Sequence, residues 1–431
     1  MSFQTHHHSL AGAQALDQEC KIRSTREDFS LPPSHNGKNQ LYFAGHSLGL
    51  MPKKARTYIE EELQDWERFG VEGHFHARHP WLPYHEFLTP SFAKLVGAKE
   101  TEVVAMNTLT VNLHLALVSF YQPNGKRRKI LIENNTFPSD KYAVDSQAQF
   151  HGLDPADVVV QLKPRAGQMT VSTEDIIAQI EELGDELALV MLGNCNYLSG
   201  QCFPFAKIVE AGHRQGAKVG FNLAHGAGNL KLELHDWNVD FAVWCSYKYL
   251  NSGPGGLAGS FFHEKHCLDK NLKRFAGWWG HNKQTRFQMG PHFDALPTAE
   301  AWSLSNPPIF QLASLRASME IFDRVGMTAL REKGDRLTSY LEWRLLEKNP
   351  GLIEIVTPAW SAQSQNRGSM ICVKVKTKPQ HLLEQLKEKD VILDFREPDI
   401  LRITPAPLYN TYEDVFHLTE IIHESLKGQK A

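Results

Sequence analysis

Lys248 is the residue of this sequence that is best placed for nucleophilic chemistry. It follows residues 240–245, a short and mostly apolar run that is typical of a buried strand. After it come residues 251–256, a glycine- and proline-rich loop, and residues 256–262, which indicate a second strand. A lysine at the end of a buried strand is partly desolvated, and desolvation favours the neutral, nucleophilic amine. Lys248 therefore suits a Schiff-base lysine, although its spacing alone also fits a surface lysine on a turn.

The other polar candidates also follow predicted strands. Strands and helices alternate from about residue 100 to residue 262, which indicates an α/β domain with a mainly parallel sheet. In such domains, ligands bind beyond the carboxyl ends of the strands. The candidates that stand just after a strand are Leu109, Thr110, Phe137, Asp140, Ser199, Asn222, His225 and Lys248.

Several of these residues have an ordinary structural explanation when they are taken singly. Thr110 and Asp140 could serve only as helix N-caps, and Phe137 could be a core phenylalanine. An isolated histidine such as His225 is usually a core residue with satisfied hydrogen bonds. Spacing alone therefore leaves the structural and the chemical explanations open.

The chain divides into an N-terminal arm and two domains. Residues 1–40 are polar and indicate an irregular arm, whereas residues 41–305 form the large α/β domain. Residues 306–431 begin with long helices and continue as a smaller α+β domain. Helices are predicted over residues 53–69, 84–96, 109–120, 309–325, 327–349, 380–389 and 411–426, and strands over residues 157–160, 353–356, 370–375, 391–394 and 400–403.

Composition restricts the partners and the compartment. A net charge of −3 over 431 residues gives no general attraction to nucleic acid or to an anionic membrane. No apolar run approaches the roughly 20 residues of a membrane span, and the N-terminus has no apolar signal core. The six cysteines show neither CxxC nor zinc spacing, and such scatter suits a reducing compartment. We expect a cytoplasmic protein with no metal site.

Three long motifs carry a resemblance to a known family. Residues 223–229 read LAH-x-x-GN, residues 234–256 read LHDW-x-VDFA-x-WCSYKYLN-x-G-x-GG, and residues 261–266 read F-x-HEKH. These motifs closely resemble the signature of the kynureninases, pyridoxal-phosphate (PLP) enzymes of tryptophan breakdown. The resemblance extends from Leu41 to Asn410 and so covers most of the chain.

The resemblance implies a fold, a cofactor and a reaction. The fold would be that of the PLP-dependent transferases (fold type I), assembled as a homodimer with active sites at the subunit interface. The cofactor would be bound to Lys248, the lysine of SYKYLN. The reaction would be hydrolysis of L-kynurenine or L-3-hydroxykynurenine to alanine and anthranilate or 3-hydroxyanthranilate.

The resemblance also assigns roles to single residues. Arg402 would bind the substrate α-carboxylate, because guanidinium forms two parallel charge-assisted hydrogen bonds with a carboxylate. Tyr247 would contact the phosphate and assist proton transfer. Ser47, His74 and Asn306 match positions that favour 3-hydroxykynurenine. The positions that match cofactor contacts are Leu109, Thr110, Phe137, Asp140, Ser199, Asn222, His225, Tyr247 and Lys248, together with Trp278 and Asn306 from the partner subunit.

Asn222 departs from the family pattern. The family motif has aspartate there, as the anionic partner of the pyridine nitrogen, whereas an asparagine amide carries no charge. Loss of a charged hydrogen bond costs roughly 1.5–3 kcal/mol, which would slow the carbanion step about 10- to 150-fold. His46 is a smaller departure, since the family usually has asparagine there.

Three interpretations of Asn222 stay open. The protein could be a kynureninase that compensates elsewhere, a different PLP lyase or desulfurase on the same fold, or a PLP-binding homologue with low or no activity. The rest of the site matches the family, which favours the kynureninase reaction.

Overall fold

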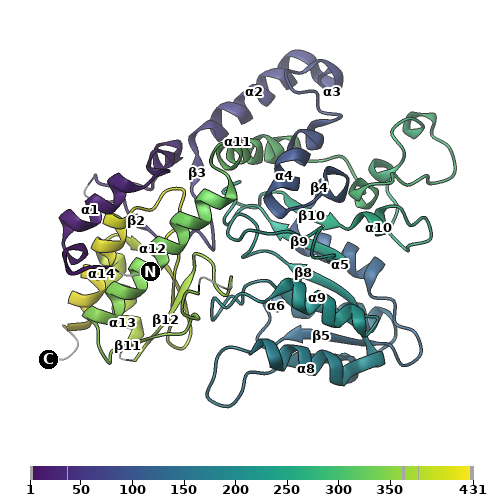
Figure 1. Ribbon diagram of the computed structural model, residues 1–431. Coiled ribbons are helices and arrows are strands. Elements are labelled where there is room, and N and C mark those ends of the chain that lie inside the picture. The colour runs from purple at the N-terminus through teal and green to yellow at the C-terminus, as the bar shows by residue number, and fades with distance from the viewer. Residues whose placement is uncertain (1–2, 36, 362–364, 377, 428–431) are drawn as a thin grey trace.

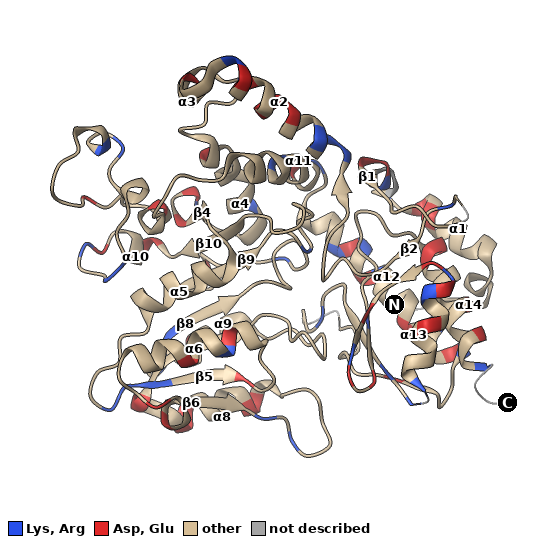
Figure 2. Ribbon diagram, turned by 180° about the vertical axis from the view of Figure 1, so that it is seen from behind, with Lys and Arg blue, Asp and Glu red and all other residues tan. Residues whose placement is uncertain are grey.

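The computed structural model describes residues 3–35, 37–361, 365–376 and 378–427. It consists of a large domain built on a seven-stranded sheet and a smaller domain built on a four-stranded sheet (Figure 1). Charged residues of both signs are interspersed over the two domains (Figure 2).

The large sheet has the strand order β4-β10-β9-β8-β7-β5-β6. The pairs from β6 to β9 are parallel, whereas β10 pairs antiparallel with β9 and β4. This sheet confirms the predicted α/β class with mainly parallel strands. The strands are β4 (Val103–Ala105), β5 (Lys129–Glu133), β6 (Val159–Leu162), β7 (Leu187–Gly193), β8 (Lys218–Asn222), β9 (Phe241–Cys245) and β10 (Ala258–Phe262).

Helices cover both faces of this sheet, so its strands are mostly apolar, with polar residues mainly at their ends. In β5, Leu131 packs into one hydrophobic cluster, and its neighbours Ile130 and Ile132 pack into the other. The first cluster includes α8 (Thr173–Leu183) and α9 (Phe205–Arg214), and the second includes α5 (Leu109–Phe120) and α6 (Pro138–Phe150). Burial on both faces leaves the carboxyl ends of the strands as the place for polar side chains.

The smaller domain has an antiparallel sheet in the order β11-β12-β15-β14. Its strands are β11 (Ile353–Ile355), β12 (Ile371–Val375), β14 (Asp394–Arg396) and β15 (Ile400–Ile403), and its helices are α12 (Met327–Lys348), α13 (Pro379–Glu388) and α14 (Tyr412–Lys427). The predicted strand over residues 391–394 is divided, because β13 (Val391–Ile392) pairs instead with β2 (Leu41–Tyr42). The pairing of β2 with β13 therefore joins the first residues of the predicted large domain to the smaller domain.

The prediction that residues 1–40 are irregular is wrong for part of this segment. Residues Leu10–Glu19 form the helix α1, and the Ser9 hydroxyl accepts a hydrogen bond from the amide of Gly12. Ala13 and Leu16 are buried in the core of the smaller domain. Tertiary burial thus stabilises a short helix whose sequence gives only a weak periodic signal.

Two further element boundaries differ from the predictions. Residues Pro155–Val158 form the short helix α7, because Asp154 caps it and proline suits its first turn. The strand β6 therefore begins only at Val159. The helix predicted over residues 84–96 is a 3₁₀ segment, Tyr84–Leu88, followed by α4 (Thr89–Val96). The remaining elements are β1 (Phe29–Ser30), β3 (Met51–Pro52), α2 (Lys53–Phe69), α3 (Gly73–His76), α10 (Glu264–Cys267) and α11 (Ile309–Val325).

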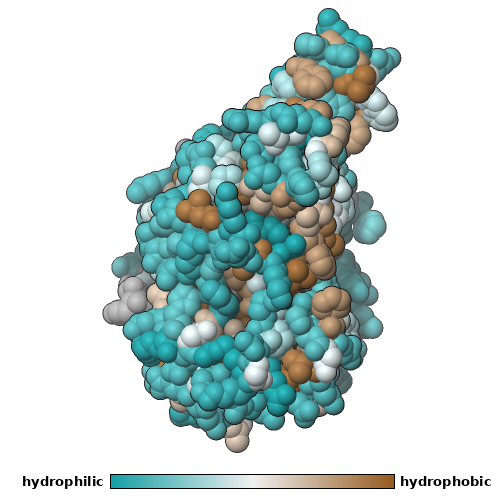
Figure 3. Space-filling view, turned by 90° about the vertical axis from the view of Figure 1, so that its right-hand side faces the viewer, coloured by the Kyte–Doolittle hydropathy of each residue, from teal (hydrophilic) through white to brown (hydrophobic). Residues whose placement is uncertain are grey.

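Two parts of the large domain project from its body, namely α2 with α3 and the segment 268–296 (Figure 1). Apolar patches interrupt the hydrophilic surface of the projection at the top of Figure 3 and of the body below it. Exposed apolar side chains on the two projecting parts are Trp66, Val71, Phe75, Phe275, Trp278, Phe287 and Met289. Within the described residues, no helix combines the length and the apolar composition needed to cross a membrane.

Candidate functional site

A cavity of about 460 Å³ lies where β5, β7, β8 and β9 of the large sheet end and the smaller domain begins. Its walls come from Glu133, Gly193 and Asn222 at three strand ends and from Tyr247 and Lys248 after β9. The remaining lining residues are His46, Ser47, Thr108, Leu109, Thr110, Phe137, Ser139, Asp140, Cys195, Tyr197, Ala224, His225, Arg396 and Arg402. The topology therefore gathers residues that are far apart in the sequence around one lysine.

Lys248 is held in this cavity by its backbone and by its neighbours. Its Nζ lies 3.4 Å from Nε2 of His225 and 6.0 Å from the ring centroid of Phe137. A Cβ on Gly49 would come within 2.3 Å of the Lys248 carbonyl oxygen, so glycine is needed there for close packing. Burial lowers the pKa of Lys248 below its ordinary value. This environment favours the neutral amine that a nucleophilic lysine requires.

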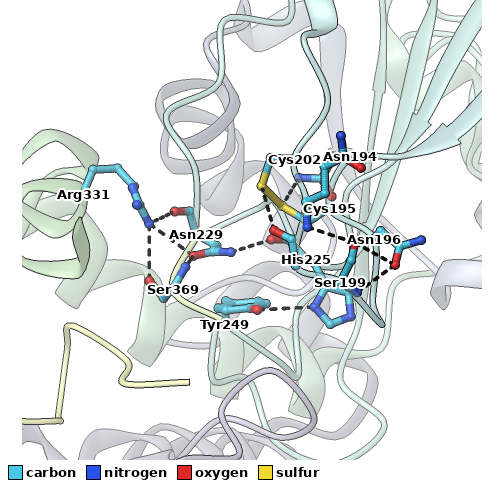
Figure 4. The surroundings of a disulfide bond; sticks show 12 residues. Asn194, Cys195, Asn196, Ser199, Cys202, His225, Asn229, Tyr249, Arg331 and Ser369 are labelled. Carbon is cyan, nitrogen blue, oxygen red and sulfur yellow. Dashed lines mark hydrogen bonds between the residues drawn. A yellow bond between two sulfur atoms is a disulfide. The ribbon is translucent and has the colours of Figure 1, made fainter. Parts of the chain in front are cut away.

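His225 is a neutral histidine beside the lysine. Burial and the nearby charge of Lys248 hold the pKa of His225 well below its usual range. Its Nδ1 lies 3.3 Å from the Tyr249 hydroxyl, and its backbone carbonyl accepts a hydrogen bond from Asn229 (Figure 4). Asn229 in turn accepts from the Ser369 amide of the smaller domain. His225 is thus fixed by contacts that join the two domains.

Two acidic residues, Asp140 and Glu133, also line this cavity. Asn222 Nδ2 donates to Oδ2 of Asp140 at 2.7 Å, and its Oδ1 accepts from the Ala224 amide. Burial raises the pKa of Asp140 to about 6 and, with a smaller contribution from the charge of Asp140, raises the pKa of Glu133 to about 7. Two carboxyl groups that change protonation near neutral pH therefore face one cavity.

The start of α5 offers unpaired backbone N–H groups at one end of the cavity. Thr108 is its N-cap residue, and within the described chain no side chain caps the first turn. The first backbone N–H groups of a helix are therefore available, and the helix dipole favours a negative ligand there. The Thr110 hydroxyl lies 2.8 Å from the Ser139 hydroxyl at the start of α6, so two side-chain donors stand beside these amides.

Arg402 enters the cavity from the smaller domain. Its Nη2 and Nε donate to Asp394 at 2.6 and 3.2 Å, and its Nη1 donates to the carbonyl of Tyr197 at 3.1 Å. The bidentate pair with Asp394 fixes the plane of the guanidinium and leaves fewer of its N–H groups for a ligand. Arg396, which also lines the cavity and contacts Asp394, adds a second cation at this end.

Tyr247 and His46 add two groups that can share protons with a ligand. Burial and the neighbouring Cys245 thiol raise the pKa of Tyr247 to about 12, so its hydroxyl stays protonated at neutral pH. His46 is buried, and its Nδ1 shares a hydrogen bond with the Thr404 hydroxyl, whereas its Nε2 makes no hydrogen bond among the described residues and lies 3.9 Å from Oδ2 of Asp394. Burial holds the pKa of His46 well below its usual range, so this ring is neutral.

Most of the predicted site residues meet in this cavity, and a few lie elsewhere. Ser199 is buried behind the wall, where its hydroxyl donates to Asn196. His74 lies on α3, and Trp278 and Asn306 are exposed away from Lys248. The predicted site residues that line the cavity are Ser47, Leu109, Thr110, Phe137, Asp140, Asn222, His225, Tyr247, Lys248 and Arg402.

The sequence prediction missed four lining residues that bear a charge, a ring or a disulfide sulfur. Glu133 ends a predicted strand, and that position was the signal that could have identified it. Tyr197, Arg396 and Cys195 lie in loops or on a short strand, where spacing gives no signal. Cys195 forms a disulfide with Cys202, which the spacing of the cysteines did not predict, because antiparallel backbone pairing brings the two residues together.

Replacing Glu133 with glutamine should change the pH dependence of stability. The pKa of Glu133 rises from 4.5 to about 7 on folding, so the folded chain keeps a proton that the unfolded chain loses. The contribution of the protonated Glu133 carboxyl to the free energy of unfolding is fully present below about pH 4.5. It is lost as the pH rises through about 7, at a total cost of about 3 kcal/mol. Urea unfolding should show Glu133→Gln more stable than the native chain at pH 8 and unchanged at pH 4.5.

The exposed substitution Glu174→Gln is the matched control for this measurement. Its pH profile should follow that of the native chain. Identical profiles for the native chain and Glu133→Gln would contradict the assignment of a buried, proton-holding carboxyl to Glu133.

Comparison with known sequences gives one consistent family. The family model of the kynureninase C-terminal domain matches residues 330–422. A kynureninase of Myxococcus xanthus (strain DK1622) is 57% identical over 410 residues, which cover 95% of this chain and 96% of that protein. A kynureninase of Koribacter versatilis (strain Ellin345) is 51% identical over 405 residues, which cover 94% of this chain and 95% of that protein.

Solved structures share the fold at much lower identity. A mutant of C-DES with glycine covalently linked to its PLP cofactor has a TM-score of 0.74 and 19% identity, and the match covers 90% of this chain and 97% of that one. The cysteine desulfurase of Thermococcus onnurineus NA1 has a TM-score of 0.75 and 15% identity, covering 94% and 98%. These similarities confirm the predicted fold type I.

Proposed function

Because this chain belongs to the kynureninase family, we propose that it cleaves the Cβ–Cγ bond of L-kynurenine or L-3-hydroxykynurenine with water, using PLP bound at Lys248. The products are alanine and anthranilate or 3-hydroxyanthranilate. The chain is accordingly a PLP-dependent hydrolase of carbon–carbon bonds. The observation that supports the role of Lys248 is its position in the cavity, where burial lowers its pKa beside His225.

The cavity has the donor set that PLP needs. The uncapped start of α5 and the Thr110 hydroxyl suit its phosphate, and Phe137 offers a ring for stacking. Lys248 supplies the amine, and Asp140 supplies a carboxylate in the same cavity. PLP, when bound, accepts the electron pair that is set free on the substrate during bond cleavage.

Asp140 is the residue that can compensate for Asn222. The amide of Asn222 donates to Asp140 and accepts from Ala224, so both of its polar atoms are engaged within the chain. It therefore holds the Asp140 carboxylate in place and does not itself offer a charge. A pyridinium nitrogen beside Asp140 would lower the pKa of this carboxyl from its raised value and form the charged pair that Asn222 cannot form.

The remaining residues bind the substrate and move protons. Lys248 Nζ would take the proton from the substrate α carbon once it is released as a free amine. The protonated hydroxyl of Tyr247 would donate to the leaving fragment. The N–H groups of Arg402 that Asp394 and the Tyr197 carbonyl leave free, with Arg396, would hold the α-carboxylate.

Two alternatives remain for the reaction. The fold neighbours include a desulfurase and a C–S lyase, but their identity of 15–19% supports the fold alone, whereas kynureninases match at 48–57%. A homologue with low activity would follow if Asp140 did not compensate for Asn222. Alanine and anthranilate from kynurenine would support the kynureninase reaction, and sulfur release from cysteine would support the alternative enzyme class.

The family resemblance also implies a homodimer with shared sites. Trp278 and Asn306 lie away from Lys248 within one chain, and both are exposed. The projecting parts of the large domain carry exposed apolar side chains, among them Phe287 and Met289, which a second copy could cover. We infer that Trp278 and Asn306 complete the site of the partner subunit. The localisation consistent with this enzyme of tryptophan catabolism is the cytoplasm.

Co-expression of two inactive variants should restore activity if sites are shared. Lys248→Ala damages the site in its own chain, whereas Asn306→Ala would damage the site of its partner. A mixed dimer therefore contains one site with both defects and one intact site. Random pairing should give about a quarter of the native turnover, because half of the dimers are mixed and each has one native site.

The measurement is turnover by the co-purified mixture, with each variant alone as a control. Turnover no greater than the sum of the two separate variants would contradict the sharing of Asn306 between subunits. Pairing Lys248→Ala with Asp140→Asn is the matched negative control, because mixed dimers then have one defect in each site.

A further inference from the structure

The Cys195–Cys202 disulfide joins the two ends of a loop that forms part of the cavity wall. The two residues pair in antiparallel fashion, and the Phe203 amide donates to the Asn194 carbonyl on the next pair. Cys195 lines the cavity of Lys248, whereas Cys202 lines a separate groove of about 720 Å³ together with Phe203 and Arg367. The bond therefore lies between the proposed cofactor site and a second opening on the protein surface.

The loop closed by this bond contacts three walls of the proposed active site. Asn196 Nδ2 donates to Glu133 at 3.2 Å. Asn196 Oδ1 accepts from the Ser199 amide and hydroxyl, and Figure 4 shows these two residues beside the disulfide. The Tyr197 carbonyl accepts from Arg402, and its ring lies edge-on to Phe137 with centroids 5.6 Å apart. A change in the position of residues 194–203 would therefore alter the contacts of Glu133, Phe137 and Arg402 at the same time.

The other cysteines do not offer a comparable bond. Cys20, Cys245, Cys267 and Cys372 are unpaired, and all of them lie in the described part of the chain. In a reducing compartment, such as the cytoplasm proposed above, disulfides are usually redox-responsive rather than permanent. A disulfide in an otherwise thiol-containing chain, beside a catalytic cavity, thus points to a responsive role.

We propose that the Cys195–Cys202 disulfide is a redox modification site, reduced by a dithiol, whose oxidised form fixes residues 194–203 against the cavity and strengthens its hold on the cofactor. The effect on the cofactor rests on the proposed function, whereas the effect on the loop does not. Reduction leaves the loop attached only through its hydrogen bonds and ring contacts, so its residues sample more conformations.

The exchange balances with a dithiol as the two-electron reductant. One thiolate of the dithiol attacks the Cys202 sulfur from the groove, forming a mixed disulfide and releasing the Cys195 thiolate. The second thiol of the reductant then attacks its own sulfur in the mixed disulfide and releases Cys202. The protein gains two thiols after protonation, and the dithiol becomes a cyclic disulfide.

The test compares the full-length protein in its oxidised form, after dithiothreitol treatment and desalting, and as the Cys202→Ser variant. Thiol titration establishes the redox state, and hydrogen–deuterium exchange is measured without PLP. We expect amides of residues 194–203 to exchange about tenfold faster in both the reduced and the variant protein. PLP dissociation, followed by absorbance, should be about tenfold faster in the same two forms.

Two controls separate reduction from substitution. Cys202→Ser should not respond further to dithiothreitol, and the buried, unpaired Cys372→Ser variant should respond as the native chain does. Equal loop exchange and equal PLP dissociation in the oxidised and reduced chains would overturn the proposal. Absence of a disulfide after treatment with an oxidised dithiol would also overturn it.

The outcomes also distinguish this proposal from the proposed function. Redox-dependent loop exchange in a protein that binds no PLP in either state would support the loop restraint and contradict the cofactor assignment. Redox-independent exchange in a protein that binds PLP normally would leave the proposed function intact and contradict the redox site.

Discussion

Replacing Lys248 with alanine is expected to lower kcat about 10⁴-fold, the upper end of what one positioned acid–base group contributes. Lys248 combines two tasks in the proposed mechanism, since its amine binds the cofactor and afterwards moves the α proton. Burial lowers its pKa, so the amine is suited to both tasks. The measurement is steady-state turnover of L-kynurenine together with the absorption band of bound PLP.

Lys231→Ala is the matched control. Lys231 lies in the same stretch of sequence but is exposed and pairs with Glu233 on the surface. Its removal should leave both turnover and the absorption band unchanged. Full turnover and an unchanged band in Lys248→Ala would contradict the assignment of the cofactor lysine.

Replacing Asp140 with asparagine is expected to lower kcat about 10- to 150-fold. The carboxyl of Asp140 is the charged group that Asn222 holds in the cavity, and loss of a charged hydrogen bond costs roughly 1.5–3 kcal/mol. The variant would place two amides at this wall and leave the pyridine nitrogen without its anionic partner. Steady-state turnover at neutral pH measures the effect.

Exchanging the two side chains provides the sharpest version of this experiment. The double variant Asp140→Asn with Asn222→Asp keeps one carboxylate and one amide at hydrogen-bond distance but reverses their positions. It should recover most of the activity lost in Asp140→Asn. Asp145→Asn, which removes a carboxylate ion-paired to Lys141 on the same helix, should have little effect.

Two results would show that Asp140 does not compensate for Asn222. Native turnover in Asp140→Asn would show that its carboxylate does not serve the cofactor. A large gain of activity in Asn222→Asp alone would show that the native chain is not compensated by Asp140.

The sequence predicts the large domain well because its strands are buried on both faces. Such strands are continuous apolar runs, and residues 240–245 match β9 closely. The helix predicted over residues 309–325 has the bounds of α11, because an apolar stripe repeats along its length. In contrast, α1 depends on contacts with the distant helix α14, which local periodicity does not reveal.

The site residues that follow from the order of strands are also predicted well, whereas those that depend on tertiary contacts are not. Asn222 and Lys248 follow strands of one sheet, so topology alone brings them to the same edge. Arg402 is placed by the family resemblance rather than by spacing. The hydrogen bond from Asn222 to Asp140 and the bond between Cys195 and Cys202 are tertiary contacts that no spacing rule provides.

The most direct test of the proposed function is turnover of L-kynurenine and L-3-hydroxykynurenine by the purified native chain with PLP. The proposed function predicts equimolar alanine and anthranilate, or alanine and 3-hydroxyanthranilate, with activity that requires PLP. Asn222→Asp measured in parallel shows whether the native residue limits the rate. Production of neither aromatic acid by the native chain or the variant would contradict the kynureninase reaction.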